Sequence, residues 1–287
     1  MWLALSLLTA LSASAQEVTA KRTVPQTGPY LAAWGWMFFS IPFMAVMLFF
    51  GGPVVLAPGF WVTLACGGAL LTVSGFTLFR AIDAGELSVT LPILSFTPLL
   101  MLVTSPLIVG EWPGMWGVAG ILLIIAGSCV LFYDPLSGGP VVALRRLWSA
   151  RSSRLMLVTA VLFSIGANVD KVGVLQSSPM AWSVALNMVV AVGMGIIAFR
   201  RTPDAVNRVR QSFPWLVLMG LFAAIMMFVQ MTALTLAPAA HVIAIKRTSI
   251  LFSSLAGFYF LGEKGAGQRI PAIILMLAGI FVISFFK

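Results

Sequence analysis

The sequence predicts an all-α integral membrane protein with ten transmembrane helices, arranged as two inverted five-helix repeats. Three observations predict this class: the composition, the lengths of the apolar segments and a repeat between the two halves. Hydrophobic residues make up 60% of the 287 residues, charged residues make up 9%, and the mean hydropathy is +1.05. Because a soluble domain averages about 25% charged residues, this chain has too few polar side chains to cover a globule in water. Helices are expected because a helix satisfies its backbone hydrogen bonds internally, as lipid requires.

The apolar segments have the length of membrane-crossing helices. Each is about 20 residues long, which lets a helix cross roughly 30 Å of hydrocarbon. The predicted spans are 2–19, 30–50, 59–81, 87–109, 114–133, 154–174, 180–199, 212–236, 240–261 and 267–286. The longest connection, "DPLSGGPVVALRRLWSARSS", mixes turn residues with basic residues. We therefore expect a first five-helix repeat at 1–135, a basic connecting loop at 136–153 and a second five-helix repeat at 154–287.

The first segment has two interpretations. "MWLALSLLTALSASAQE" resembles a secretory signal, in which Ala13-Ser14-Ala15 would be the cleavage site. A signal peptide also needs a positive amino-terminal region, but no lysine or arginine precedes Lys21. We expect residues 1–20 to stay as the first span, because an offset of 150 places Lys21 on Lys171 in the sixth segment.

An internal repeat organises the chain. An offset of 152 places residues 79–133 on 231–285 without a gap. Gly110-Glu111 then falls on Gly262-Glu263, and Ala126-Gly127 falls on Ala278-Gly279. Because each half has an odd number of predicted spans, the second half enters the membrane from the opposite side. This is the inverted repeat that many secondary transporters use.

These residues resemble the drug/metabolite transporter superfamily, in particular its ten-span members with two EamA repeats. The resemblance rests on the Gly-Glu pairs that end the fourth and ninth spans, and on the Ala-Gly pairs in the spans that follow. The sixth-span sequence "SIGANVDKVGV" is also similar to the family's first-helix pattern. The resemblance implies a carrier of small organic compounds, such as amino acids, drugs, nucleotide sugars or sugar phosphates.

Lys246 and Arg247 interrupt the apolar run "HVIAIKRTSILFSSL" and are the main site candidates. A charge at the centre of a span costs roughly 2.5–3.5 kcal/mol on insertion scales, so it indicates function. Helical spacing would place Ser249 and Ser253 on the face of Lys246, as in the wall of an aqueous cavity. A guanidinium beside an ammonium suits a carboxylate or a phosphate. The alternative is that both side chains extend to the nearer interface.

The resemblance supports an anion site at this pair. Plastidic sugar-phosphate translocators of the superfamily carry a Lys-Arg pair at the matching place in the ninth span, where it holds the phosphate. The spacing from His241 to Lys246 differs from theirs, which leaves the substrate open. His241 opens the span, so it is either an interfacial residue or a substrate contact.

Five further ionisable residues are candidates for coupling or gating. Asp170 and Lys171 are adjacent and cannot face each other on a helix, and an interfacial anchor is the simplest role for both. Arg80 is expected to pair with Asp83 at an interface. Glu111 and Glu263 are expected to start the following helices, where a carboxylate suits the positive amino-terminal dipole. The alternative role for these two glutamates is proton coupling.

Other residue types indicate packing. Cys66 and Cys129 lie in apolar segments and are expected to be buried reduced thiols. Trp61, Trp112, Trp116 and Trp182 fit interfacial belts. We find no nucleophile arrangement, phosphate loop or metal-ligand spacing in the sequence, and we therefore expect neither an enzyme nor a cofactor.

The net charge of +9 reflects basic loops and does not indicate a nucleic-acid partner. Twelve lysines and arginines fall at odd-numbered loops: Lys21, Arg22, Arg145, Arg146, Arg151, Arg154, Arg200, Arg201, Arg208, Arg210, Lys264 and Arg269. The positive-inside rule places these loops in the cytoplasm and both termini outside. The family resemblance suggests the reverse orientation. We predict the orientation that the charges favour.

The sequence therefore predicts a secondary-active transporter with alternating access, which moves a small anionic or zwitterionic metabolite across a bacterial plasma membrane. Its partners would be the lipid bilayer, the substrate and either a proton or a counter-substrate. One alternative is an exporter of neutral or aromatic amino acids or drugs, in which Lys246 and Arg247 are structural. The other is a membrane protein without transport activity, which the inverted repeat disfavours. The oligomeric state is not predicted.

Overall fold

The computed structural model describes residues 1–48, 54–84, 93–131, 150–252 and 269–285, and the regular elements of these residues are α-helices. Their bounds are α1 Trp2–Thr27, α2 Pro29–Phe38, α3 Ile41–Leu48, α4 Phe60–Ala84, α6 Thr97–Ile108, α7 Met115–Leu131, α9 Arg151–Leu175, α10 Pro179–Arg201, α11 Ala205–Gln211, α12 Phe213–Leu236, α13 Ala239–Lys246 and α15 Arg269–Phe285. Each predicted span overlaps at least one of these helices, and α11 is an additional short helix between two of them.

Five described helical segments are long and apolar enough to cross a membrane. They are Pro29–Val46, Phe60–Ala84, Arg151–Leu175, Pro179–Arg201 and Phe213–Leu236. Large apolar side chains also cover the outside of the bundle: Trp61, Leu107 and Val192 are each at least 65% exposed. Such a surface suits lipid and would be unfavourable in water. The chain is therefore an all-helical integral membrane protein, while the count of ten spans stays a prediction.

The first helix buries polar residues. Its buried positions include Thr9, Thr19 and Thr23. The Thr9 hydroxyl donates to the Leu5 carbonyl at 2.9 Å, and the Thr23 hydroxyl donates to the Thr19 carbonyl at 2.8 Å. Because these hydroxyls bond within their own helix, these threonines can be buried in the bundle without polar partners from other helices.

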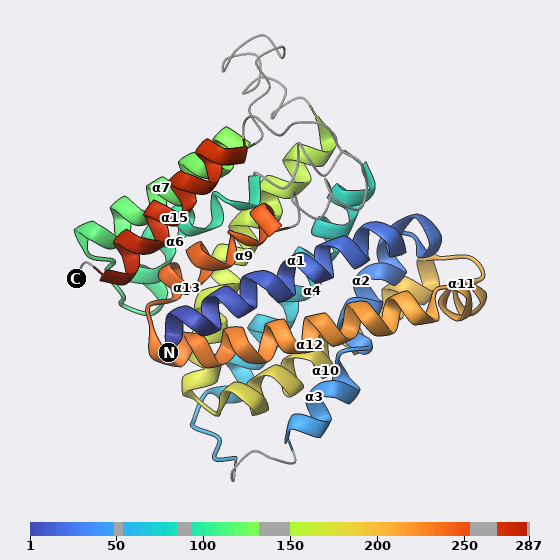
Figure 1. The fold of residues 1–287 in the computed structure, drawn as a ribbon. Helices are drawn as coiled ribbons and strands as arrows, with labels where there is room; N and C mark the ends of the chain where they lie inside the picture. Colours follow the sequence, from blue (N-terminus) through green and yellow to red (C-terminus); the bar gives the residue numbers. More distant parts are fainter. Residues whose placement is uncertain (49–53, 85–92, 132–149, 253–268, 286–287) are drawn as a thin grey trace.

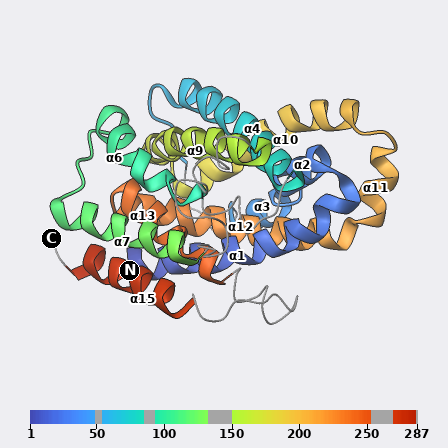
Figure 2. The same cartoon turned by 90° about the horizontal axis from the view of Figure 1, so that it is seen from above.

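The four most extensive helix contacts join the two predicted halves. α1 packs along α12, α9 packs along α4, α2 packs on α10, and α7 packs on α15. Figure 1 shows α1 beside α12 and α7 beside α15, and Figure 2 shows α9 beside α4 on the other side of the bundle. Every one of these pairs joins a helix of the first half to a helix of the second.

Small residues bring α7 and α15 into backbone contact. A Cβ atom on Gly120 would lie 2.7 Å from the carbonyl oxygen of Gly279, and one on Gly127 would lie 2.9 Å from that of Ala272. Without side chains at Gly120, Gly127 and Gly279, the two helices can pack this closely. An offset of 152 carries Gly120 onto Ala272 and Gly127 onto Gly279.

Two expectations about packing are wrong. Cys66 and Cys129 are free thiols, as expected, but both are exposed, because they lie on the outer faces of α4 and α7. Trp182 is fully buried and therefore does not belong to an interfacial belt. Its indole ring packs over Gly173 of α9, where a side chain would overlap the ring.

The two ends of the bundle differ in charge. At one end, Trp2 of α1 and Ile283 of α15 line the same cavity, so both termini lie there. At the other end, Arg22 of α1 lies 5.1 Å from the Trp215 ring at the start of α12. The last turns of α10 and α11 carry four arginines at this basic end: Arg200, Arg201, Arg208 and Arg210.

Candidate functional site

A central cavity lies between α1, α2, α4, α9, α12 and α13. It has two adjoining chambers, each of about 60 Å³, and both are lined by Trp36, Phe163, Met226, Lys246 and Arg247. Ligand pockets are usually about 300–1,000 Å³, so this cavity is contracted and must widen to admit a metabolite. Because α1, α2 and α4 belong to the first predicted half and the other helices to the second, the cavity lies between the halves.

The two cations occupy the end of a short helix. α13 ends at Lys246, and the next backbone N–H group, that of Arg247, is shared between the carbonyls of Ile243 and Ala244. The Thr248 hydroxyl then donates to the Ile245 carbonyl at 2.7 Å, so a side-chain hydrogen bond also stabilises this turn. The helix is therefore broken at residues 247 and 248.

The cations point inward. The Lys246 ammonium donates to Gln230 Oε1 at 2.6 Å, and Arg247 Nη2 donates to Thr97 Oγ1 at 3.0 Å. The Arg247 side chain also passes over the Phe163 ring, 5.9 Å from its centroid, and Arg247 is only 6% exposed. Neither side chain therefore extends to the membrane interface, the alternative that the sequence had left open.

Two carboxylates balance the two cations. Asp170 of α9 lines the chamber of Lys246, and its Oδ1 accepts a 3.0 Å hydrogen bond from the buried Trp182 indole. Glu17 of α1 lines the other chamber. The carboxylates of Glu17 and Asp170 attract the Lys246 ammonium, and Glu17 also attracts the Arg247 guanidinium. The cavity is therefore lined by two basic and two acidic side chains.

The predicted polar stripe on the ninth span does not form as expected. The spacing argument assumed an unbroken helix, but the turn at Arg247 and Thr248 redirects the chain. Ser249 donates to Glu17 Oε1 at 3.2 Å and supports that carboxylate from outside the cavity lining. Ser253 lies outside the described residues.

The first half contains a matching helix break. Ser95 and Phe96 form a turn, and the Phe96 N–H group donates to the Ile93 carbonyl at 3.1 Å. The offset of 152 places these two residues on Arg247 and Thr248. The bond from Arg247 to Thr97 joins one break to the other. The sequence offered no sign of these breaks beyond Pro92 and Pro98, which flank the first one.

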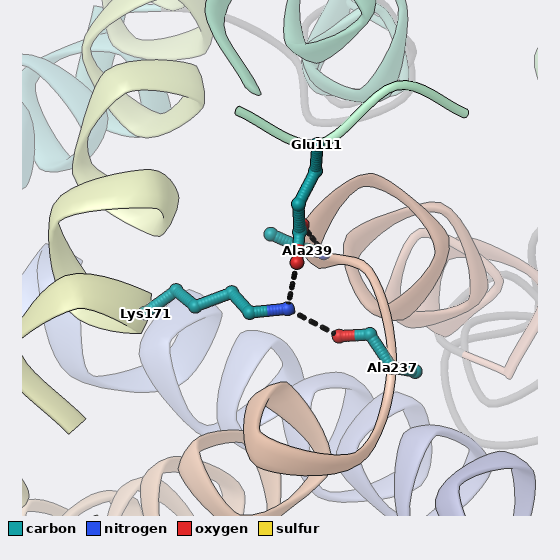
Figure 3. A network of polar contacts seen from close by, with 4 residues as sticks. All are labelled: Glu111, Lys171, Ala237 and Ala239. Atoms are coloured by element: carbon teal, nitrogen blue, oxygen red, sulfur yellow. Dashed lines mark hydrogen bonds and ion pairs between the residues drawn. The ribbon is translucent and has the colours of Figure 1, made fainter. Parts of the chain in front are cut away.

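A charged network closes the end of the bundle that carries the termini. Figure 3 shows Lys171 of α9 donating both to the Glu111 carboxylate and to the Ala237 carbonyl, the latter at 2.8 Å. The other carboxylate oxygen of Glu111 accepts the Ala239 N–H group at 2.9 Å. Gly110, with φ of +73°, turns the chain after α6 and directs Glu111 toward this partner.

This network corrects two expectations. Glu111 does stabilise the start of a helix, but the helix is α13, from the other half of the chain, and not the following helix α7. Lys171 is 7% exposed and is not an interfacial anchor. As expected, Asp170 and Lys171 point in different directions, one into the cavity and one to Glu111.

Three other candidate residues lie apart from the central cavity. His241 lines a separate cavity of about 260 Å³ beside Trp2 and Gly117. Arg80 is half-buried near the end of α4, and within the described residues it forms no ion pair with Asp83, which is exposed. Glu263 lies outside the part of the chain that the structure describes.

Sequence reasoning missed three residues of the cavity lining, Glu17, Trp36 and Gln230, and also Thr97, which bonds Arg247. Glu17 and Gln230 are polar residues within helices that could have been noticed, whereas nothing in the sequence distinguishes Trp36 and Thr97 from the other aromatic and hydroxyl residues of the apolar segments. In the described segments, no group of three His, Cys, Asp or Glu side chains could hold a metal ion.

Comparisons with known proteins agree with this architecture. The sequence matches the EamA-like transporter family over residues 1–133 and again over residues 152–285. A crystal structure of a protein with 16% sequence identity superposes with a TM-score of 0.72, covering 96% of each chain. At this identity, the likeness concerns the fold alone. No curated protein matches the sequence.

Proposed function

This chain belongs to the EamA-like transporter family, and we propose that it works as a secondary-active transporter with alternating access, whose substrate is a small zwitterionic metabolite with an apolar group. The substrate site is the central cavity. The observation that carries this proposal is the burial of Lys246, Arg247 and Asp170 around one space between the halves. A bacterial plasma membrane is its proposed location, with a proton or a counter-substrate driving transport.

The helix contacts support an inverted repeat of two five-helix halves, with the bounds expected from the sequence. Exchanging the halves converts the pair α1 and α12 into the pair α9 and α4, and both pairs pack lengthwise. The same exchange converts the contact of Gly120 with Gly279 into that of Ala272 with Gly127. Such reciprocal contacts are those of a two-fold interface. Halves related in this way can rock about a central site and expose it to each side in turn.

The charges of the cavity favour a zwitterion over a phosphate. Lys246 and Arg247 suit a carboxylate, while Asp170 suits an ammonium group. A dianionic phosphate would add two negative charges to a site that already contains Glu17 and Asp170, and buried uncompensated charge is costly. The walls formed by Trp36, Phe163 and Met226 suit an apolar substituent.

A transport assay in proteoliposomes tests the proposal. The probes are L-phenylalanine, its amine analogue phenethylamine, its acid analogue 3-phenylpropionate, and glycerol 3-phosphate. We expect the fastest exchange for L-phenylalanine. Faster exchange of glycerol 3-phosphate, or no exchange of any probe, would refute the proposed substrate class.

Substitution of Arg247 provides a second test, for which Arg80 offers a matched control. Arg247→Lys keeps the charge but removes the planar fork, so exchange of L-phenylalanine should fall about tenfold or more. Arg80→Lys makes the same change outside the cavity and should have no effect.

Lys246 and Arg247 already have hydrogen-bond partners within the protein. This observation favours a second candidate function, an exporter in which both residues have structural roles. Lys246 already bonds Gln230, and Arg247 already bonds Thr97. In that case Arg247→Lys would lower thermal stability in detergent but leave the ranking of the four probes unchanged.

A further inference from the structure

Two buried side chains of the cavity lining, Trp36 and Arg247, carry hydrogen-bond donors without a partner among the described residues. Trp36 is 4% exposed and Arg247 is 6% exposed, and each lines both chambers. Within the part of the chain that the structure describes, neither the indole Nε1–H of Trp36 nor the Nε–H of Arg247 has an acceptor. Buried polar groups of native proteins are nearly always hydrogen-bonded, so these two donors require an explanation.

Their neighbours hold both donors in place. The Arg247 guanidinium is fixed by the bond from Nη2 to Thr97 and by the Phe163 ring beneath it. The Trp36 indole packs against Phe79, with ring centroids 5.8 Å apart. Donors that are fixed in position and lack a protein acceptor are prepared for an acceptor that enters the cavity.

We propose that Trp36 is a substrate-binding residue, and that its Nε1–H group and the Nε–H group of Arg247 donate to the same carboxylate of the substrate. This inference rests on the proposed transport function and deepens it. The two donors orient the substrate in the cavity. Its carboxylate lies between Trp36 and Arg247, and its ammonium group lies toward Asp170, whose carboxylate is held by the hydrogen bond from Trp182.

The first test compares two tryptophans of the same helix. Trp36→Phe removes the indole N–H group but keeps an aromatic ring. Trp34→Phe makes the same change two residues earlier, where the indole packs against Gly195 and not against the cavity. Affinities of the purified full-length protein in detergent are measured for L-phenylalanine, 3-phenylpropionate and phenethylamine.

We expect Trp36→Phe to weaken the two carboxylates about tenfold, the usual effect of one lost hydrogen bond to a charged group. Phenethylamine, which has no carboxylate, should bind as before, and Trp34→Phe should change none of the three affinities. Equal weakening of all three compounds, or of none, would overturn the proposal and leave Trp36 as a packing residue or as the partner of a water molecule.

The second test asks whether the two donors share one acceptor. If they do, the loss in the double variant Trp36→Phe/Arg247→Lys should be smaller than the product of the two single losses. Independent, multiplying losses would contradict a shared carboxylate. If Trp36→Phe fails to fold, the indole ¹⁵N–H resonances of the unaltered protein replace it: one of them should shift with 3-phenylpropionate and not with phenethylamine. No such shift would overturn the proposal.

These results separate the inference from the proposed function. If the unaltered protein binds none of the three compounds, the substrate class is wrong and the role of Trp36 falls with it. If it binds the carboxylates and Trp36→Phe has no selective effect, the inference alone is wrong.

Discussion

Gly173 is the residue on which the buried indole of Trp182 rests. A Cβ atom there would overlap the ring, whereas a Cβ atom on Gly166 of the same helix would meet nothing within 4 Å. Trp182 in turn donates to Asp170. The lack of a side chain at Gly173 therefore affects the position of a carboxylate in the cavity.

We therefore predict that the same glycine-to-alanine substitution has different effects on stability at two positions of α9. Gly173→Ala should lower the free energy of unfolding by about 1–3 kcal/mol, the usual cost of overpacking a core. Gly166→Ala should leave it unchanged or raise it by up to about 1 kcal/mol, because alanine favours helix. Thermal unfolding of both variants in one detergent measures the difference. Equal melting temperatures would mean that Trp182 does not depend on Gly173.

At the scale of elements, Glu111 links three helices. It follows α6, pairs with Lys171 of α9 and accepts the first N–H group of α13. Because α13 ends at Lys246, a change in Glu111 can reach the central cavity through a single short helix.

Glu111→Ala should therefore destabilise the protein by about 3–5 kcal/mol, since it leaves Lys171 buried without a counter-charge. Glu111→Gln should cost less, because the amide oxygen can still accept the Ala239 N–H group. Adding Lys171→Met to Glu111→Gln should recover stability, since the uncompensated charge is removed. Chemical or thermal unfolding measures the order, and the same cost for both single variants would argue against the helix-capping role.

At the scale of the whole molecule, the Lys171–Glu111 pair lies where the halves meet at the end that carries the termini. In the sequence, the offsets of 150 and 152 match Lys171 with Lys21 and Glu111 with Glu263. Under alternating access, one pair should close while the other opens.

Cross-linking tests this alternation. Cysteines at 111 and 171, joined by a short thiol-reactive linker in a protein lacking Cys66 and Cys129, should stop exchange. A linker between cysteines at 21 and 263 should also stop it, and the site should then be accessible from opposite sides in the two cross-linked proteins. Continued exchange in either protein would contradict the gating role.

The distribution of basic residues predicts the orientation of the protein in the membrane. The basic end gathers Arg22 and the arginines of α10 and α11, while the termini lie at the opposite end. The positive-inside rule then places the termini outside the cytoplasm. A carboxy-terminal reporter that is active only in the cytoplasm should be silent, and strong activity would reverse the assignment.

Properties that depend on residues close together in the chain could be predicted from the sequence. Hydropathy over about 20 residues indicated the helices, the repeated Gly-Glu and Ala-Gly pairs gave the offset, and two charges within an apolar run marked Lys246 and Arg247. These signals are local or periodic, so they are visible along the chain without a fold.

The pairing of the buried polar groups could not be predicted from the sequence, because it depends on how the helices pack. Glu111 bonds Ala239, 128 residues away, and Arg247 bonds Thr97, 150 residues away. Lipid offers no hydrogen-bond partners, so each buried polar group must find one within the bundle, and helix packing determines which one it meets. For the same reason His241 lies in a different cavity from Lys246, and Trp36, one aromatic residue among many in the sequence, lines the central cavity with an unpaired donor.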